Sequence, residues 1–144
     1  MSEFEDVLAA LNEARVRYLL IGGVASILHG VPRTTVDIDI ALDPKRENVR
    51  RAIRTLRKIG LVADTEVVDD ILAQGDVTTS NEVSVDLLTD LRGAKFATLW
   101  RRRKAFRYGR VRASVVSKAD QIRILRAAGR RKDLEDAEYL KSLR

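Results

Sequence analysis

The chain has 144 residues, 45% of them hydrophobic, which is the usual size of one domain that closes its own core. It has no cysteine, so disulfide frameworks, cysteine zinc sites and thiol nucleophiles are excluded. Lys and Arg total 27 against 21 Asp and Glu, and the formal charge of +6 favours polyanionic partners such as triphosphates or RNA. We expect a single domain over residues 1–144.

The start of the chain is acidic where a secretory signal would be basic. No run reaches the roughly 18 apolar residues that a membrane-spanning helix needs. The sequence therefore predicts a cytoplasmic protein without a membrane partner.

The first elements are a helix, a strand and a tight turn. Ser2 with Glu5 three residues on forms a capping-box pattern, and apolar residues follow at helical spacing. The apolar run 18–21 predicts a short strand that ends in a Gly-Gly turn, and residues 24–29 predict a brief helix.

A strand with one acidic face comes next. Residues 36–42 alternate strictly, with apolar side chains on one face and Asp37 and Asp39 on the other. A helix follows, with Asp43 as its cap and Pro44 at its first position.

The rest of the chain mixes strands and helices. We expect strands at 77–79, 83–88 and 111–116, and helices from Ser117 to about residue 129 and from 132 to 143. Trp100 with the cations that follow it indicates either a binding edge or, more commonly, a half-buried Trp that anchors a basic helix. The predicted fold class is α+β, a mixed α/β sandwich: a central mixed sheet with flanking helices, covered mainly on one face, and a helical C-terminus.

The acidic strand predicts a metal site. Carboxylates at i and i+2 of a strand lie roughly 6 to 7 Å apart on one face, and they repel unless a cation lies between them. Mg²⁺ prefers one or two carboxylates together with phosphate oxygens. The alternative is that Asp37 and Asp39 are the wet side of an edge strand.

A third carboxylate strengthens the metal interpretation. Residues 83–88 also alternate, so Asp86 faces as the acidic pair does if the two strands lie side by side in register. Three such carboxylates can hold two magnesium ions, one at the acceptor hydroxyl and one on the triphosphate. Asp76 and Asp90 are nearby alternatives for the third position.

These residues lie in segments that resemble a known family. The sequence contains YLLIGGVASILHGVPRTTVDIDIAL, followed by NEVSVDLLTD and SKADQIRILRAAGRRKDLEDAEYL. This combination resembles the DNA polymerase beta-like nucleotidyltransferase superfamily over about residues 18 to 140, in particular its small bacterial and archaeal members of the abortive-infection and toxin–antitoxin type.

The resemblance implies the roles of the central residues. Gly22 and Gly23 would contact the triphosphate, Asp37 and Asp39 would bind metal, and Asp86 would be the third ligand and the base for the acceptor hydroxyl. The alternative for the glycines is a purely conformational role in the turn.

Further cations and carboxylates have two interpretations each. Arg33 and Thr34 precede the acidic strand, where a guanidinium either contacts a phosphate or pairs with a carboxylate. The resemblance implies that Lys132, Asp133 and Asp136 reach the site, but Lys132 and Asp136 also have the spacing of a surface ion pair. The single histidine, His29, is expected to cap or pack.

The predicted function is transfer of a nucleotide from a nucleoside triphosphate to an acceptor. We expect the acceptor to be held by short loops, by a dimer partner, or through its own size as a macromolecule such as tRNA or a protein. An antibiotic or other small alcohol is the alternative acceptor. The resemblance also implies a small partner or antitoxin protein. One rival is a non-catalytic nucleotide-binding module of a two-protein complex, and a second is a basic RNA-binding domain. The three carboxylates favour the enzyme.

Overall fold

The computed structural model describes residues 3–61, 76–80 and 84–143. Its helices are α1 (Glu3–Glu13), α2 (Gly22–Leu28), α3 (Arg46–Lys58), α5 (Phe96–Arg101), α6 (Lys118–Ala128) and α7 (Arg131–Ser142). Its strands are β1 (Tyr18–Ile21), β2 (Asp37–Leu42), β3 (Asp76–Ser80), β4 (Ser84–Leu88), β5 (Lys104–Tyr108) and β6 (Val111–Val115).

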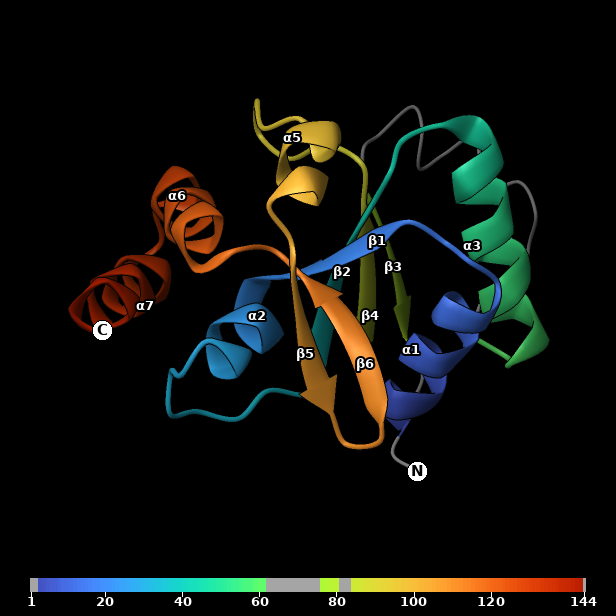
Figure 1. Ribbon diagram of the computed structural model, residues 1–144, viewed down its shortest axis with the longest axis horizontal. Coiled ribbons are helices and arrows are strands. Elements are labelled where there is room, and N and C mark those ends of the chain that lie inside the picture. The colour runs from blue at the N-terminus through green and yellow to red at the C-terminus, as the bar shows by residue number, and fades with distance from the viewer. Residues whose placement is uncertain (1–2, 62–75, 81–83, 144) are drawn as a thin grey trace.

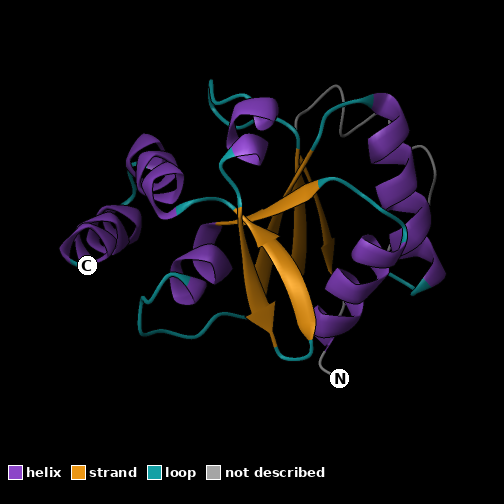
Figure 2. Cartoon of the chain, viewed as in Figure 1, coloured by secondary structure: helices purple, strands orange, loops and turns teal. Residues whose placement is uncertain are grey.

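The strands form one mixed sheet in the order β3-β4-β2-β1-β6-β5. β1 runs antiparallel to β2 and parallel to β6, and β2 runs parallel to β4. Figure 2 shows the sheet in the middle of the chain with helices around it. The predicted α+β class with a central mixed sheet and a helical C-terminus is confirmed.

Helices cover both faces of the sheet. All four residues of the central strand β1 are buried, which requires cover on both sides. Figure 1 shows α1 and α3 on one side and α2 on the other, with α6 and α7 beyond α2. The expectation of cover mainly on one face is therefore wrong, because α2 folds back over the sheet directly after β1.

The core has two parts. The larger joins α1, α3 and the sheet, and it includes residues such as Leu8, Leu20, Ile40 and Leu56 that are fully buried. The smaller consists of Val31, Leu125, Ala137 and Leu140. This second cluster fixes the pair of C-terminal helices against the loop that leads from α2 to the acidic strand.

Some element boundaries differ from the prediction. α3 begins at Arg46, after Asp43 has accepted a hydrogen bond from the Lys45 amide at 3.1 Å in a turn of its own. Trp100 belongs to α5, as expected, but that helix ends at Arg101, and the basic segment continues as the unpredicted strand β5. The predicted cap Ser2 lies outside the described residues.

No helix in the described part of the chain is long and apolar enough to cross a membrane.

Candidate functional site

The register of two parallel strands brings the acidic residues together. In the β2–β4 pair, Asp39 lies directly opposite Asp86, and Asp37 lies opposite Ser84. Directly opposed residues point to the same face of a sheet, so Asp37, Asp39 and Asp86 share one face. Neither alternative is in register with Asp39, because Asp90 is beyond the strand and Asp76 is aligned with Leu88 at the far end of β4.

Asp39 is the electrostatic centre of this face. Its pKa is raised from 3.8 to about 7, first by burial, then by a hydrogen bond with Asp86 and by the charges of Asp86 and Asp37. Arg130 acts in the opposite direction and lowers the pKa. The carboxylates thus carry an excess of negative charge that a cation would relieve.

The turn after β1 lies against this carboxylate. Gly22 has a φ of +66°, and a Cβ at this position would collide with Oδ2 of Asp39. Gly23 has no such restriction, since a Cβ there would meet Thr35 Oγ1 at an ordinary 3.7 Å. Gly22 is therefore the residue of the turn that needs a positive φ and that leaves no room for a side chain beside Asp39.

Gln121, which the sequence reasoning did not single out, holds the turn from α6. It is fully buried, and its Nε2 donates to the Gly22 carbonyl at 2.8 Å and to Ser26 Oγ at 3.0 Å. Its position within an amphipathic helix looks like any buried position, so only the docking of α6 on α2 reveals the contact.

A cavity of about 190 Å³ opens beside Asp39. The Gly22 turn forms one wall, and apolar side chains of β4, the following loop and α6 form much of the rest. The lining residues are Ile21, Gly22, Asp39, Leu88, Asp90, Leu91, Arg92, Ile124, Leu125, Ala127, Ala128, Arg130 and Asp133.

Arg130 is a cation at this cavity, and a buried carboxylate holds its side chain in place. It is the N-cap residue of α7, and its Nε and Nη2 atoms donate to Asp133 at 2.7 and 3.2 Å. The Asp133 side chain is only 6% exposed, whereas the Arg130 side chain is 78% exposed. The guanidinium group of Arg130 is therefore held in one direction by Asp133 and remains accessible to a ligand.

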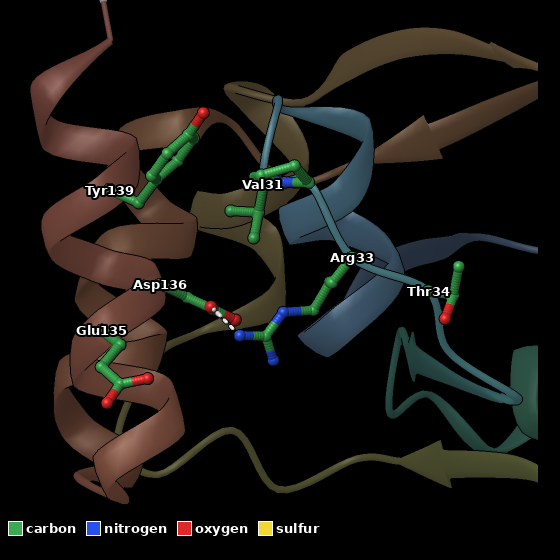
Figure 3. Close-up of a pocket in the computed structure, with 7 residues that line it drawn as sticks. Val31, Arg33, Thr34, Glu135, Asp136 and Tyr139 are labelled. Atoms are coloured by element: carbon green, nitrogen blue, oxygen red, sulfur yellow. Dashed lines mark ion pairs between the residues drawn. The ribbon is translucent and has the colours of Figure 1, made fainter.

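Arg33 and Asp136 form an ion pair away from this cavity. Figure 3 shows the Arg33 side chain extending from the loop after α2 to Asp136 on α7, with an N–O distance of 2.6 Å. Burial raises the pKa of Asp136, and Arg33 and then Lys132 oppose this. Arg33 and Thr34 line a separate open hollow of about 530 Å³ together with Glu135, Asp136 and Tyr139.

The structure thus separates the predicted C-terminal residues. Asp133 reaches the Asp39 cavity, Asp136 binds Arg33, and Lys132 is exposed and lines neither hollow. His29 lies at the C-cap of α2, where its Nε2 is 2.7 Å from the Val116 carbonyl and its ring packs edge-on against Phe106. Its packing agrees with the expectation.

The carboxylates fit a magnesium ion only in combination with a ligand. Within the described residues, no group of three or more His, Cys, Asp or Glu side chains could hold a metal ion by itself. Asp39 and Asp86 are in hydrogen-bond contact, and Asp37 is the exposed member at the start of β2. Mg²⁺ usually takes one or two carboxylates and completes its shell with water and phosphate oxygens, so this donor set suits it when a phosphate is present.

Comparison with known proteins identifies the fold. No protein-family model and no curated protein sequence matches the chain. A candidate nucleotidyltransferase from Thermotoga maritima has a similar structure, with a TM-score of 0.63 and 17% identity over 96% of this chain and 88% of that one. The lincosamide antibiotic adenylyltransferase LnuA, solved with lincomycin bound, gives a TM-score of 0.65 and 20% identity over 100% of this chain and 99% of its own. The chain therefore has a nucleotidyltransferase-like fold.

Proposed function

We propose that the protein is a magnesium-dependent nucleotidyltransferase that transfers NMP from a nucleoside triphosphate to an acceptor hydroxyl or phosphate. The observation that carries this proposal is the β2–β4 register, which sets Asp39 beside Asp86, with the Gly22 turn in contact with Asp39. A sheet has no structural need for clustered carboxylates that raise one another's pKa, and such clusters are typical of functional sites.

The reaction forms one bond and breaks another. An acceptor oxygen attacks the α-phosphorus in line, the bond from this phosphorus to the bridging oxygen breaks, and pyrophosphate leaves. When the acceptor is a hydroxyl, its proton passes to the carboxylate pair of Asp86 and Asp39, with Asp86 as the proposed base. Mg²⁺ held by Asp37, Asp39 and Asp86 would neutralise the charge of the triphosphate and of the leaving pyrophosphate.

Other residues of the chain would position the nucleotide. Gly22 lets a phosphate approach the backbone because no side chain stands in the way, and Gly23 continues the turn. The partly apolar cavity beside Asp39 is the proposed place of the nucleoside, since ligand pockets combine apolar walls with a few polar groups. Arg33 would act indirectly, by fixing the loop that leads into β2 through its ion pair with Asp136, and Thr34 lies beside it in the same loop.

The structure offers a better-placed cation than Lys132. Arg130 shares the cavity with Gly22 and Asp39, and Asp133 aims its guanidinium. The guanidinium edge that Asp133 does not occupy can bind phosphate oxygens in two places at once, which the single ammonium of Lys132, two residues on, does not do. We therefore propose Arg130 as the cation on the transferring phosphoryl group, with Lys132 as the competing assignment.

The direct test replaces the acidic residues one at a time. Asp37→Asn and Asp39→Asn should each reduce transfer of label from an α-labelled nucleoside triphosphate, and release of pyrophosphate, by at least a hundredfold. The amide keeps the volume but loses the charge that holds the metal. Asp6→Asn, on the exposed face of α1, is the matched control and should retain wild-type turnover. Retention of more than a tenth of the activity in both site variants would contradict the proposal.

The acceptor and the cellular role are further parts of the proposal. The fold alone does not select them, because one fold serves many substrates. We propose a macromolecular acceptor, an RNA or a protein, and a toxin-type role with a small partner protein. Expression in a bacterial host tests the role: the wild type should arrest growth and Asp39→Asn should not. Normal growth with active wild-type enzyme would exclude it.

A further inference from the structure

One surface of the molecule is formed by a segment of the chain that has many basic residues and no acidic ones. It is formed by residues 96–116, which make α5, β5 and β6 and contain neither Asp nor Glu. The cations of this segment, all exposed, are Arg101, Arg102, Arg103, Lys104, Arg107, Arg110 and Arg112. We call this the β5–β6 basic surface. Figure 1 shows that β5 is the last strand of the sheet on this side.

The strand pairing concentrates this charge. Arg107 lies directly opposite Arg112 in the antiparallel pair, and Arg110 lies in the turn between the two strands. Like charges in directly opposed positions destabilise a hairpin. Among the described residues, no Asp or Glu forms an ion pair with Arg107, Arg110 or Arg112. A bound anion would remove this repulsion.

Some cations of the described chain have carboxylate partners. Within the surface, Arg102 contacts Asp120 at 2.8 Å, and outside it Arg123 contacts the same carboxylate at 2.8 Å and Arg131 contacts Glu135 at 3.3 Å. Near the hairpin, Glu5 of α1 lies against Gly109 at the turn. Asp120 at Arg102 and Glu5 at the turn are thus the carboxylates that the structure describes beside this surface, and they are fewer than its seven cations.

The surface is also hollowed. A cavity of about 220 Å³ is lined by Ala105, Phe106, Arg107, Arg110 and Arg112. Three of these five residues are arginines, so the hollow presents guanidinium groups from both strands and the turn. Guanidinium groups bind phosphate oxygens in a forked geometry, which makes phosphate the matching chemistry.

The other end of the surface combines an arginine with an aromatic ring. The Arg103 guanidinium lies 3.8 Å from the centroid of the Trp100 ring and donates to the Trp100 carbonyl at 2.9 Å. Arg103 is thereby ordered while it stays exposed. Four residue steps along β5 separate Arg103 from Arg107 of the hollow, a distance of roughly 13 Å at 3.3 Å per residue. An anion that reaches both ends must be extended and carry several charges.

We propose that the β5–β6 basic surface binds the phosphodiester backbone of RNA. RNA has regularly spaced charges over the required length, and the number of phosphates that a protein contacts determines how strongly salt weakens binding. A lipid surface fits less well, because the large hydrophobic side chains that the described structure exposes are Val36, Ile59, Leu134 and Tyr139, all outside this segment. None of the hairpin residues lines the Asp39 cavity, so this proposal stands independently of nucleotidyl transfer.

The test compares two charge-matched double variants. Arg107→Ser with Arg112→Ser removes two charges from the hairpin, and Arg54→Ser with Arg57→Ser removes two exposed charges from α3. Binding of a fluorescently labelled tRNA is measured by anisotropy between 50 and 200 mM KCl, in EDTA and without nucleotide. The hairpin variant should bind at least tenfold more weakly. The slope of its plot of log affinity against log salt concentration should be shallower by about 1.4 to 1.8, because two phosphate contacts are lost and each contributes about 0.7 to 0.9 to the slope. The α3 variant should change affinity less than threefold.

Three results would overturn the proposal. One is wild-type protein that does not bind the RNA, and another is equal weakening in the two double variants, which would reflect net charge alone. The third is hairpin-dependent binding to phosphatidylserine vesicles that exceeds RNA binding, which would assign the surface to membranes. Arg110→Ser, in the turn, gives the same test if the double variant does not fold.

The experiments distinguish an error in the RNA-binding proposal from an error in the proposed nucleotide site. Asp39→Asn should bind RNA as the wild type does, and the hairpin variant should bind ATP with magnesium as the wild type does. Loss of RNA binding in Asp39→Asn would contradict the independence of the two sites.

Discussion

Replacement of Asp39 by Asn should stabilise the metal-free protein while it abolishes transfer. The folded protein holds the Asp39 proton with a pKa of about 7, against an ordinary value of 3.8, because of burial and the neighbouring carboxylates. Between these two pH values the unfolded chain releases the proton and the folded chain keeps it. The folded state therefore binds more protons, and its stability falls as the pH rises through this window.

The pKa difference determines the size of the effect. At about 1.4 kcal/mol per pKa unit, a rise from 3.8 to about 7 corresponds to a cost of about 4 kcal/mol above pH 7. Asp39 is partly accessible and its neighbours can relax, so we expect Asp39→Asn to raise the free energy of unfolding by about 2 to 4 kcal/mol at pH 8. At pH 4 most of the cost is absent, and the gain should fall below about 1 kcal/mol.

Urea unfolding in EDTA at pH 4, 6 and 8 measures both numbers. Asp37→Asn is the control, since Asp37 is exposed at the start of β2, and we expect its stability to stay within about 1 kcal/mol of the wild type at each pH. An Asp39→Asn gain that is the same at pH 4 and pH 8 would refute the electrostatic reasoning. A loss of stability at pH 8 would show instead that the carboxylate has a structural role.

Two further predictions compare neighbouring residues. Gly22→Ala should lower magnesium-dependent ATP affinity by more than tenfold, because the new Cβ displaces Asp39 and the φ of this residue is unfavourable for Ala. Gly23→Ala should change the affinity less than threefold. Calorimetric titration measures both affinities, and equal losses would contradict the assignment of the turn to Gly22. Arg130→Ala should reduce kcat by roughly a hundredfold and Lys132→Ala by less than threefold, because a cation on the transferring group is worth several kcal/mol in the transition state. The reverse order in steady-state kinetics would restore Lys132 as the active-site cation.

Local patterns in the sequence predict the face on which each acidic residue lies. The period of two in residues 36–42 places Asp37 and Asp39 on one side of β2, and the same alternation places Asp86 on one side of β4. This period follows from the geometry of an extended chain and needs no knowledge of neighbouring elements. The Gly-Gly turn at the end of β1 is a local signal of the same kind.

The strand β5 was not predicted because its surroundings mask the pattern. At this edge of the sheet only Phe106 and Tyr108 are partly covered, and Lys104, Ala105 and Arg107 are exposed. With only these two apolar side chains partly covered, the segment lacks the longer apolar alternation that marks a strand in a sequence. The segment becomes a strand because β6 offers it a partner, which is a property of the sheet.

Tertiary structure alone decides which side chains meet. Only the β2–β4 register selects Asp86 over Asp90 as the partner of Asp39, and only the approach of β2 shows that Gly22 is the glycine that cannot carry a side chain. The docking of α6 and α7 brings Gln121 to the Gly22 carbonyl and Arg130 to the Asp39 cavity, and it engages Asp136 with Arg33. These contacts join residues far apart in the chain, and their geometry depends on how complete helices pack. Spacing along the sequence carries the periodicity of each element but not its position relative to the others.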